Sequence, residues 1–211
     1  MSRRLCARVY CTMFDESIYI RKGAYLPHWT KEGAIYHVRF RLFDSLPQEI
    51  LKSLIEEREE LTKKVKSDKK LIKSEQMRFN EVFSEKIEQY LDAGYGSCWL
   101  QREDIAQIIV NALCKYEGSR YKLYAWCIMP NHVHVIVQPQ NYQLHEILRS
   151  WKGSTARYAN QLLSRSGQFW QMEYFDHLIR NSDGFASCIE YVWKNPEDAG
   201  FKNWRWRWKK I

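Results

Sequence analysis

The chain has 211 residues, a hydrophobic content of 45% and a formal net charge of +8. This length suits one domain with a packed core, and because no run of 18 or more apolar residues occurs, the sequence predicts no membrane span. The positive excess lies toward the two ends of the chain among many aromatic residues, a composition that suits single-stranded nucleic acid about as well as an ordinary basic surface. The six cysteines are scattered without a Cys-x-x-Cys pair, which argues against a zinc knuckle or a disulfide framework and for a reducing cytoplasm.

The first half of the chain predicts one strand followed by a long charged segment. Residues 36–42 alternate strictly between apolar and polar side chains, so they predict a half-buried strand whose outer face is basic and carries Arg39 and Arg41. Residues 48–92 contain no glycine or proline, and their apolar residues recur at helical spacing, which predicts one long helix or a helical hairpin. The lysine-rich stretch 63–74 within them is typical of an exposed, solvated helix.

The second half predicts helices and strands in alternation. The pattern favours a helix over 103–116, a strand over 121–129, a tight turn at Pro130, a strand over 132–138, a helix over 144–163 and a short strand over 175–180. A last helix should begin with Ser182 as its N-cap and end near Asn195, because Pro196 follows. This order suits an α+β fold in which an antiparallel sheet carries helices on one face and the charged segment is an insertion after the first strand.

Two histidines open the strand at 132–138. His132 and His134 are two positions apart, so they share one face of the strand, while Val133 and Val135 pack the other way. Two neutral imidazoles held side by side make half of a metal site. Taken alone, such a pair is more often a pair of surface histidines, by about two to one.

The last helix supplies candidates for the rest of the site. Tyr191 and Asn195 are four residues apart and so share a helix face. An amide oxygen is a reasonable third ligand for a hard cation, and beside a cation that polarises a phosphate a phenol can attack phosphorus. Mg²⁺ prefers oxygen ligands whereas two imidazoles also suit Mn²⁺, so we expect activity with either metal.

With these residues the chain resembles the HUH single-tyrosine transposases, and within them the REP-associated tyrosine transposases. A lone His-x-His is weak support, but an ordered set of motifs is strong. The matching motifs span about residues 25–201 and are Leu26-Pro-His-Trp29, Tyr36-His-Val-Arg-Phe-Arg-Leu42, Tyr90-Leu-Asp-Ala-Gly-Tyr-Gly96, Ala125-Trp-Cys-Ile-Met-Pro-Asn-His-Val-His134, Ser150-Trp-Lys-Gly-Ser-Thr-Ala156, Phe169-Trp-Gln-Met-Glu-Tyr-Phe-Asp-His177 and Glu190-Tyr-Val-Trp-Lys-Asn-Pro-Glu-Asp-Ala-Gly200.

The resemblance implies a ferredoxin-like sheet whose histidine strand faces the tyrosine helix. It implies metal-dependent nicking and rejoining of single-stranded DNA near hairpin-forming palindromic repeats, through a covalent 5′-phosphotyrosine. Carried onto this sequence, it makes Tyr191 the nucleophile and His132, His134 and Asn195 the ligands of Mg²⁺ or Mn²⁺. Basic or polar side chains are expected to contact nucleic acid, and these are Arg39, Arg41, Arg149, Lys152, Arg157, His177 and Arg180.

The resemblance also divides the chain. It suggests an N-terminal extension (1–24), an HUH domain (25–201, with the charged helical insertion at about 48–92) and a basic aromatic tail (202–211). After Gly200 the family usually continues through a Trp-x-Ser-Ser type segment, whereas this chain reads Asn203-Trp-Arg-Trp-Arg-Trp-Lys-Lys-Ile211. The tail's tryptophans therefore fit two roles equally, stacking on bases or covering a sheet edge.

Two classes of function stay open at this point. The first is the enzyme, and the second is a regulator derived from a transposase that grips hairpin DNA or RNA without cutting it. A hydrolase that uses water would be a third, and it would leave no covalent adduct. The presence of all four expected active-site residues favours the enzyme. We expect a bacterial cytoplasmic, nucleoid-associated protein, either a monomer or a homodimer, with no membrane partner.

Overall fold

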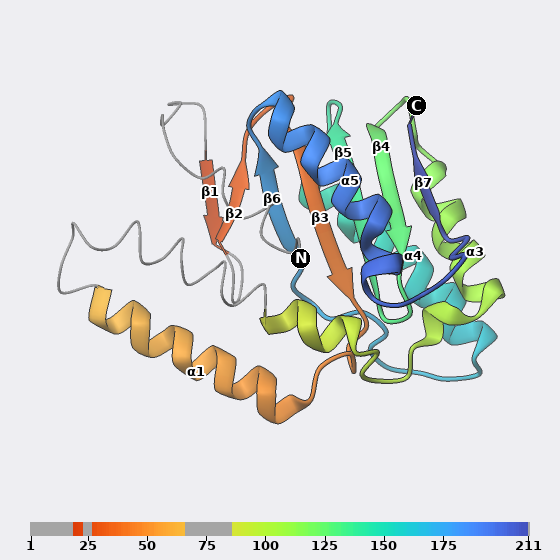
Figure 1. Ribbon diagram of the computed structural model, residues 1–211, viewed down its shortest axis with the longest axis horizontal. Helices are drawn as coiled ribbons and strands as arrows, with labels where there is room; N and C mark the ends of the chain where they lie inside the picture. The colour runs from red at the N-terminus through yellow and green to blue at the C-terminus, as the bar shows by residue number, and fades with distance from the viewer. Residues whose placement is uncertain (1–18, 23–26, 66–85, 211) are drawn as a thin grey trace.

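The computed structural model describes residues 19–22, 27–65 and 86–210 (Figure 1). Two short strands, β1 (Tyr19–Lys22) and β2 (Pro27–Thr30), form an antiparallel hairpin at one side of the domain. Most of the extension expected at 1–24, and all but the first residues of the lysine-rich stretch 63–74, lie outside the described residues.

A five-stranded antiparallel sheet forms the centre of the molecule. Its strands are β3 (Ile35–Arg41), β4 (Tyr121–Ile128), β5 (His132–Pro139), β6 (Phe175–Ile179) and β7 (Arg207–Lys209), in the spatial order β6-β3-β5-β4-β7. Taken in chain order, the first four of these strands stand in the order 4-1-3-2. This arrangement confirms the predicted α+β fold with a ferredoxin-like sheet.

Helices cover both faces of this sheet. Behind it in Figure 1 lie α3 (Glu103–Cys114) and α4 (Leu144–Leu162), which pack with Val133, Val135 and Val137 in the main core. In front lies α5 (Ser182–Asp198), which packs on Ile136 in a second, smaller core. The expectation of helices on one face therefore holds for α3 and α4 but not for α5. A strand such as β5, whose side chains are buried on both faces, needs cover on both.

The charged segment is helical where the structure describes it. Its described parts are α1 (Gln48–Val65) and residues 86–92. Lys86 Nζ lies 3.2 Å from Glu57 Oε2 of α1, and Ile87 and Leu91 form a small core with Leu46. These contacts fit the helical hairpin, and they place residues 86–92 beside the end of β3 (Figure 1).

The limits of α5 differ from the predicted ones at both ends. Its N-cap is Asn181 rather than Ser182, and the Asn181 side chain accepts a hydrogen bond of 2.7 Å from the Gly184 amide. At the other end the helix continues through Pro196 to Asp198. A proline removes one intrahelical hydrogen bond but leaves the rest of the ladder available, so one further turn can form.

The aromatic tail covers the edge of the sheet. β7 pairs with β4, Trp204 Nε1 donates to the Ile128 carbonyl at 2.8 Å, and Trp206 packs against the main core. Of the two roles left open for these tryptophans, the structure thus shows edge covering. Among the described helices none is long and apolar enough to cross a bilayer.

Candidate metal and nucleophile site

Four histidines line up across the sheet on the face that α5 covers. His177 of β6 is the strand partner of His37 of β3, and His37 Nε2 lies 2.9 Å from His134 Nδ1 of β5. The rings of His134 and His132 follow, with centroids 4.8 Å apart. Both β5 histidines are fully buried, so the structure corrects the simplest reading of a His-x-His pair as surface residues.

The two β5 histidines are in the form that binds metals. Burial lowers the pKa of His132 and His134 well below the ordinary value. The His134 ring and the nearby arginines lower the pKa of His132 further, and Arg39 does the same for His134. Both imidazoles are therefore neutral near pH 7. His132 Nδ1 lies 2.8 Å from Asn131 Oδ1, which directs the proton to Nδ1 and leaves a lone pair on Nε2. Within the described residues neither Nε2 has a hydrogen-bond partner.

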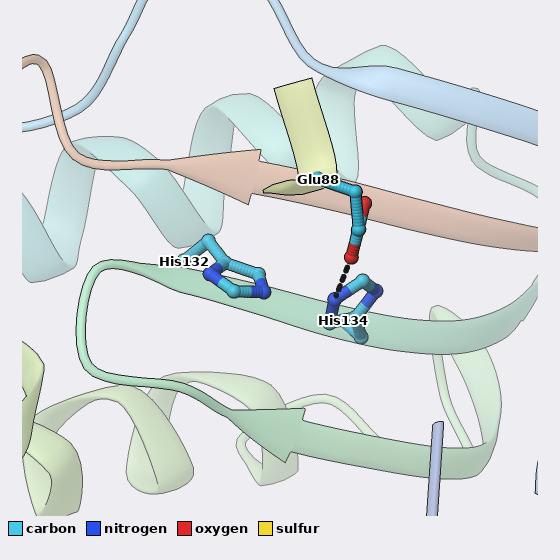
Figure 2. Close-up of side chains that lie close together, drawn as sticks. All are labelled: Glu88, His132 and His134. Atoms are coloured by element: carbon cyan, nitrogen blue, oxygen red, sulfur yellow. Dashed lines mark ion pairs between the residues drawn. The ribbon is translucent and has the colours of Figure 1, made fainter. Parts of the chain in front are cut away.

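A carboxylate from the charged segment reaches this pair. Glu88 enters from the helical residues 86–92, and its Oε1 lies 3.3 Å from His134 Nε2 (Figure 2). One ligand atom from each of Glu88, His132 and His134 lies within 4.8 Å of the other two. Two imidazoles and a carboxylate form a ligand set that suits Mn²⁺ and related divalent metals. Sequence reasoning missed Glu88, because nothing in a segment rich in glutamates separates it from its neighbours.

The tyrosine helix meets the same carboxylate. The Tyr191 hydroxyl donates to Glu88 Oε1 at 2.7 Å, and the Tyr191 ring lies 5.6 Å from the rings of His37 and His134. One turn later Asn195 is buried, and its Oδ1 has no hydrogen-bond partner within the described part of the chain. A buried amide oxygen in that state is suited to a cation. Tyr191 and the histidines of one chain thus come together without a partner subunit.

The polar face of β3 is the floor of this site. His37, Arg39 and Arg41 are only 6%, 6% and 8% exposed, whereas the sequence predicted a half-buried strand with a basic outer face. That prediction was wrong because α5 and residues 86–92 cover this face. Arg39 is the strand partner of His134 and forms an ion pair with Glu88. Burial lowers the pKa of Arg39, and the nearby Tyr191 raises it.

Arg41 is the strand partner of His132. Burial and the charge of Arg39 lower its pKa to about 10, so it stays protonated near pH 7. His177 is half-buried, and burial together with Arg180 lowers its pKa to about 4. Arg180 itself is exposed just before α5. These four residues of the predicted nucleic-acid set, Arg39 included, lie at or beside the histidine row.

The remaining three predicted contacts come from α4, on the opposite face of the sheet. Arg149 and Arg157 are exposed there, and the Arg157 guanidinium lies over the Tyr158 ring. Lys152 instead reaches the end of the sheet, where its Nζ donates to the carbonyls of Gln171 and Met172 at 2.7 and 2.6 Å. The structure therefore groups Lys152 with the site more closely than Arg149 or Arg157.

A comparison with known families agrees with this geometry. Residues 99–195, just under half of the chain, match a sequence model of the family described as "Transposase IS200 like". The matched region includes both β5 histidines and ends at Asn195, so this part of the chain is similar in sequence to the IS200-like transposases.

More particular relatives are found among curated proteins. A REP-associated tyrosine transposase of Haemophilus influenzae is 27% identical over 105 residues, which cover 42% of this chain and 58% of that protein. Another, from Escherichia coli, is 23% identical over 97 residues, or 45% of this chain and 56% of the relative. The resemblance to REP-associated tyrosine transposases that the motifs predicted is therefore confirmed, while the chain spans only somewhat more than half the length of these relatives.

A solved structure described as a REP-associated tyrosine transposase bound to a REP hairpin is also similar. It is 15% identical, and the match covers 86% of this chain and 74% of that one with a TM-score of 0.45. A score of this size does not establish a common fold, so the architecture described above rests on the strand order and packing of this chain.

Proposed function

We propose that this protein is a metal-dependent single-stranded DNA endonuclease and strand transferase that nicks near palindromic repeat hairpins through a covalent 5′-phosphotyrosine at Tyr191. One observation supports it above the others. The Tyr191 hydroxyl and the His134 imidazole approach the same carboxylate oxygen, that of Glu88, inside a buried and otherwise cationic site. A phenol, two neutral imidazoles and buried arginines are the groups that a phosphoryl transfer to tyrosine requires.

The residues present fit a divalent cation. His132 and His134 offer buried lone pairs, and Asn195 offers a buried amide oxygen without a partner among the described residues. Glu88 adds a charged oxygen next to His134. Mg²⁺ or Mn²⁺ held by these groups would polarise the scissile phosphate and neutralise the charge that develops on it.

The chain's own residues prepare the nucleophile. Glu88 accepts the hydrogen bond of the Tyr191 hydroxyl and fixes its direction, and Arg39 supplies a positive charge that stabilises a developing phenolate. Attack forms a bond from the Tyr191 oxygen to phosphorus and breaks the bond to the 3′ oxygen. The phenol loses one proton and the leaving oxygen gains one. Because the phosphotyrosine retains the energy of the broken linkage, the same 3′-OH or another can rejoin the strand without ATP.

The DNA partner is proposed from the relatives and from the shape of the site. The curated relatives are named for their association with REP sequences, and we extend hairpin-bearing single-stranded DNA to this chain. A buried site lined by one sheet face and one helix admits one strand more readily than a duplex. Because Tyr191 meets the histidines of its own chain, we infer that a monomer suffices for the first cut.

The test is formation of a protein–DNA adduct that survives denaturant. Hairpin-bearing single-stranded DNA is incubated with the protein and Mn²⁺ or Mg²⁺, and the products are separated on a denaturing gel. Wild type should give an adduct, and Tyr191→Phe should give none. Tyr124→Phe is the matched control, because Tyr124 is another half-buried phenol with a side-chain partner, Gln138, at 2.8 Å, and it should react as wild type does.

Two outcomes would contradict the proposal. Binding without any adduct under both metals would favour the regulator that grips hairpin DNA or RNA. Cleavage without an adduct, unchanged in Tyr191→Phe, would indicate a hydrolase that uses water.

A further inference from the structure

Among the residues that the structure describes, no acidic side chain pairs with the buried cation Arg41. Its polar contacts within the described residues are the Ser45 hydroxyl at 3.1 Å and the Leu42 carbonyl at 3.5 Å, both of them neutral groups. The charge of Arg39 lowers the pKa of Arg41, and Arg41 in turn lowers the pKa of Lys152 and of His132. A buried charge that lacks a counter-ion is costly, so the protein keeps a place here that an anion would stabilise.

The contrast with Arg39 sharpens this point. Arg39 lies two residues earlier on the same strand face, and Glu88 neutralises it. Arg41 stands beside His132, and a divalent cation bound to the neutral histidines would add still more positive charge next to it. A ligand phosphate is the group that would balance this charge, because a guanidinium binds phosphate oxygens through two parallel hydrogen bonds.

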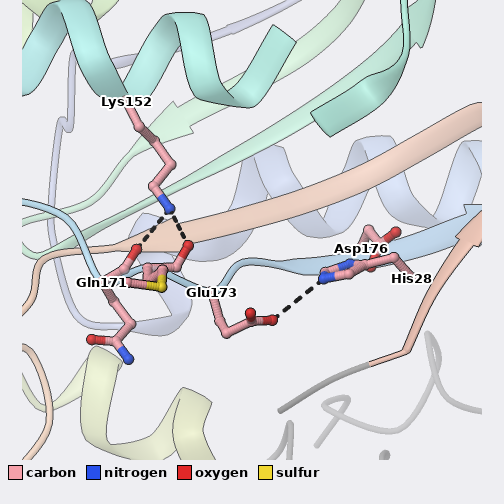
Figure 3. Close-up of polar contacts among 6 residues, drawn as sticks. His28, Lys152, Gln171, Glu173 and Asp176 are labelled. Atoms are coloured by element: carbon pink, nitrogen blue, oxygen red, sulfur yellow. Dashed lines mark hydrogen bonds and ion pairs between the residues drawn. The ribbon is translucent and has the colours of Figure 1, made fainter. Parts of the chain in front are cut away.

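Loops around Arg41 form a rim at this end of the sheet. The backbone amide of Gln171 donates to the backbone carbonyl of Arg41 at 2.9 Å. Lys152 reaches from α4 and donates to the backbone carbonyl of Gln171 (Figure 3). The Leu42 amide donates to the Asn131 carbonyl, and the Asn131 side chain donates to the Tyr95 carbonyl at 2.9 Å. Gly96 follows with φ +91°, where a Cβ would lie 2.5 Å from the Asp44 carbonyl oxygen, so the rim is built around a position that only glycine fits.

This rim exposes apolar side chains and buries an unpaired polar one. Phe43, Tyr95 and Met172 are 39%, 47% and 73% exposed. Gln171 is 7% exposed, and its Oε1 has no hydrogen-bond partner among the described residues. Aromatic faces stack on unpaired bases, and an unpaired amide oxygen can accept a hydrogen bond from a base. Stacking faces next to a cation form a surface suited to single-stranded nucleic acid.

The position of Tyr191 indicates on which side of the scissile phosphate this surface lies. The Tyr191 ring lies against His37 and His134, whereas Arg41 stands next to His132 on the other side of the histidine pair. In an in-line displacement the leaving oxygen departs opposite to the attacking one. Attack from the Tyr191 side therefore sends the 3′ oxygen toward Arg41.

We infer that Arg41 and the rim of Phe43, Tyr95 and Met172 form a subsite for the strand that leaves with the free 3′-OH. This inference rests on the proposed function. Arg41 holds the phosphate next to the scissile one on its 5′ side, and the aromatic rings hold the adjoining bases. The subsite keeps the 3′-OH close to the phosphotyrosine, so that rejoining competes with escape of the cut strand.

The test combines an Arg41 variant with DNA in which one phosphate at a time is replaced by an uncharged methylphosphonate. Hairpin-bearing DNA oligonucleotides, each with one methylphosphonate, are bound to Tyr191→Phe protein, and the cut is mapped from the wild-type adduct. We expect one methylphosphonate, directly 5′ of the cut, to weaken binding about tenfold. Adding Arg41→Gln should weaken binding to natural DNA by a similar factor and abolish the effect of that methylphosphonate alone, while Arg41→Lys restores part of it.

The two aromatic residues of the rim are tested with alanine variants and a matched control. Phe43→Ala and Tyr95→Ala should each weaken binding about tenfold. Tyr142→Ala is the control, because Tyr142 is 41% exposed but lies beyond the far end of β5, and it should change binding less than twofold. Loss of folding is checked by circular dichroism.

Two results would overturn the inference. In one, Arg41→Gln protein responds to every methylphosphonate as its parent does. In the other, the position coupled to Arg41 lies 3′ of the cut. Because binding is measured with protein that lacks the phenol, failure of wild type to form an adduct would count against the proposed function without obscuring whether Arg41 contacts a single phosphate.

Discussion

The two faces of β5 are buried equally but differ in what they bury. Val133, Val135 and Val137 pack into a core of hydrocarbon side chains beneath α3 and α4. On the other face, His132 and His134 are just as inaccessible, yet their Nε2 atoms have no hydrogen-bond partner within the described residues and their strand neighbours are two arginines. The valine face satisfies the requirements of a folded core, and the histidine face does not.

This difference teaches where stability and function reside. Burying polar groups without partners, and cations without counter-ions, opposes folding by several kcal/mol in general. A protein retains such an arrangement where a ligand completes it. A substitution on the histidine face should therefore mainly lower activity, and one on the valine face should mainly lower stability. His134 and Val135, which are neighbours on one strand, allow this to be tested.

The largest effect is expected for His134→Asn. The shorter amide can still hydrogen bond in the direction of His37 but withdraws the imidazole nitrogen that faces Glu88. Adduct formation should fall about a thousandfold, because a bound metal contributes several kcal/mol to the transition state. The free energy of unfolding should change by no more than about 1 kcal/mol. Rates from denaturing gels and urea titrations measure the two quantities.

Val135→Ala is the matched control on the other face. Val135 is fully buried, so removal of two methyl groups should lower the free energy of unfolding by about 2 kcal/mol. The adduct rate of the folded fraction should stay close to that of wild type. If Val135→Ala abolished cleavage while His134→Asn mainly destabilised the fold, the division of roles between the faces would be wrong.

Acid should lower the free energy of unfolding through the protonation of His177. Burial and Arg180 lower the pKa of this imidazole to about 4, from about 6.5 in an unfolded chain, and His37 is its partner on β3. The unfolded state therefore binds the proton first. The stability that His177 contributes is complete above pH 6.5 and is lost as the pH falls toward 4, by up to about 3 kcal/mol.

His177→Gln should remove this part of the pH dependence. Urea titrations at pH 7, 6 and 5 should show a smaller loss of stability for the variant than for wild type over that range. Equal slopes for the two proteins would show that His177 does not carry the acid sensitivity.

The sequence predicted the parts of the site that lie on regular elements. The period-two pattern around His132 and the four-residue spacing of Tyr191 and Asn195 each fix which side chains share a face, and the structure places those faces toward each other. Such patterns are local, so they survive without knowledge of the fold. The order of the elements predicted an antiparallel sheet, and the family resemblance implied a ferredoxin-like one, whereas the strand order 4-1-3-2 itself comes from the structure.

What the sequence could not predict depends on contacts distant along the chain. Glu88 and His134 are 46 residues apart, and contacts distant along the chain, such as the packing of Ile87 and Leu91 against Leu46, bring the carboxylate over the sheet. For the same reason Arg39 and Arg41 were expected to face solvent, since alternation shows that two faces differ but not what covers them. The tail's pairing with β4 is equally non-local.

A smaller loss of stability and activity is expected for substitutions in the tail, because its contacts hold α5 in place over the histidine face. Arg207 donates to the Trp193 carbonyl at 2.7 Å, pairs with Glu197 at 2.8 Å, and lies over the Trp193 ring at 4.2 Å. The Arg207 side chain is 15% exposed, so water screens these contacts only in part. Arg207→Ala should lower the free energy of unfolding by about 1 kcal/mol.

Arg207→Ala should also slow adduct formation about threefold, since Trp193 is two residues from Tyr191 on the same helix and a looser α5 presents the phenol less often. Arg205→Ala is the matched control. Its side chain is 61% exposed and pairs with an exposed Glu103, so neither stability nor rate should change measurably. If the two variants behaved alike, the tail would cover the sheet edge without holding α5. The histidine face would then depend for its cover on the small core beneath that helix and on Glu88.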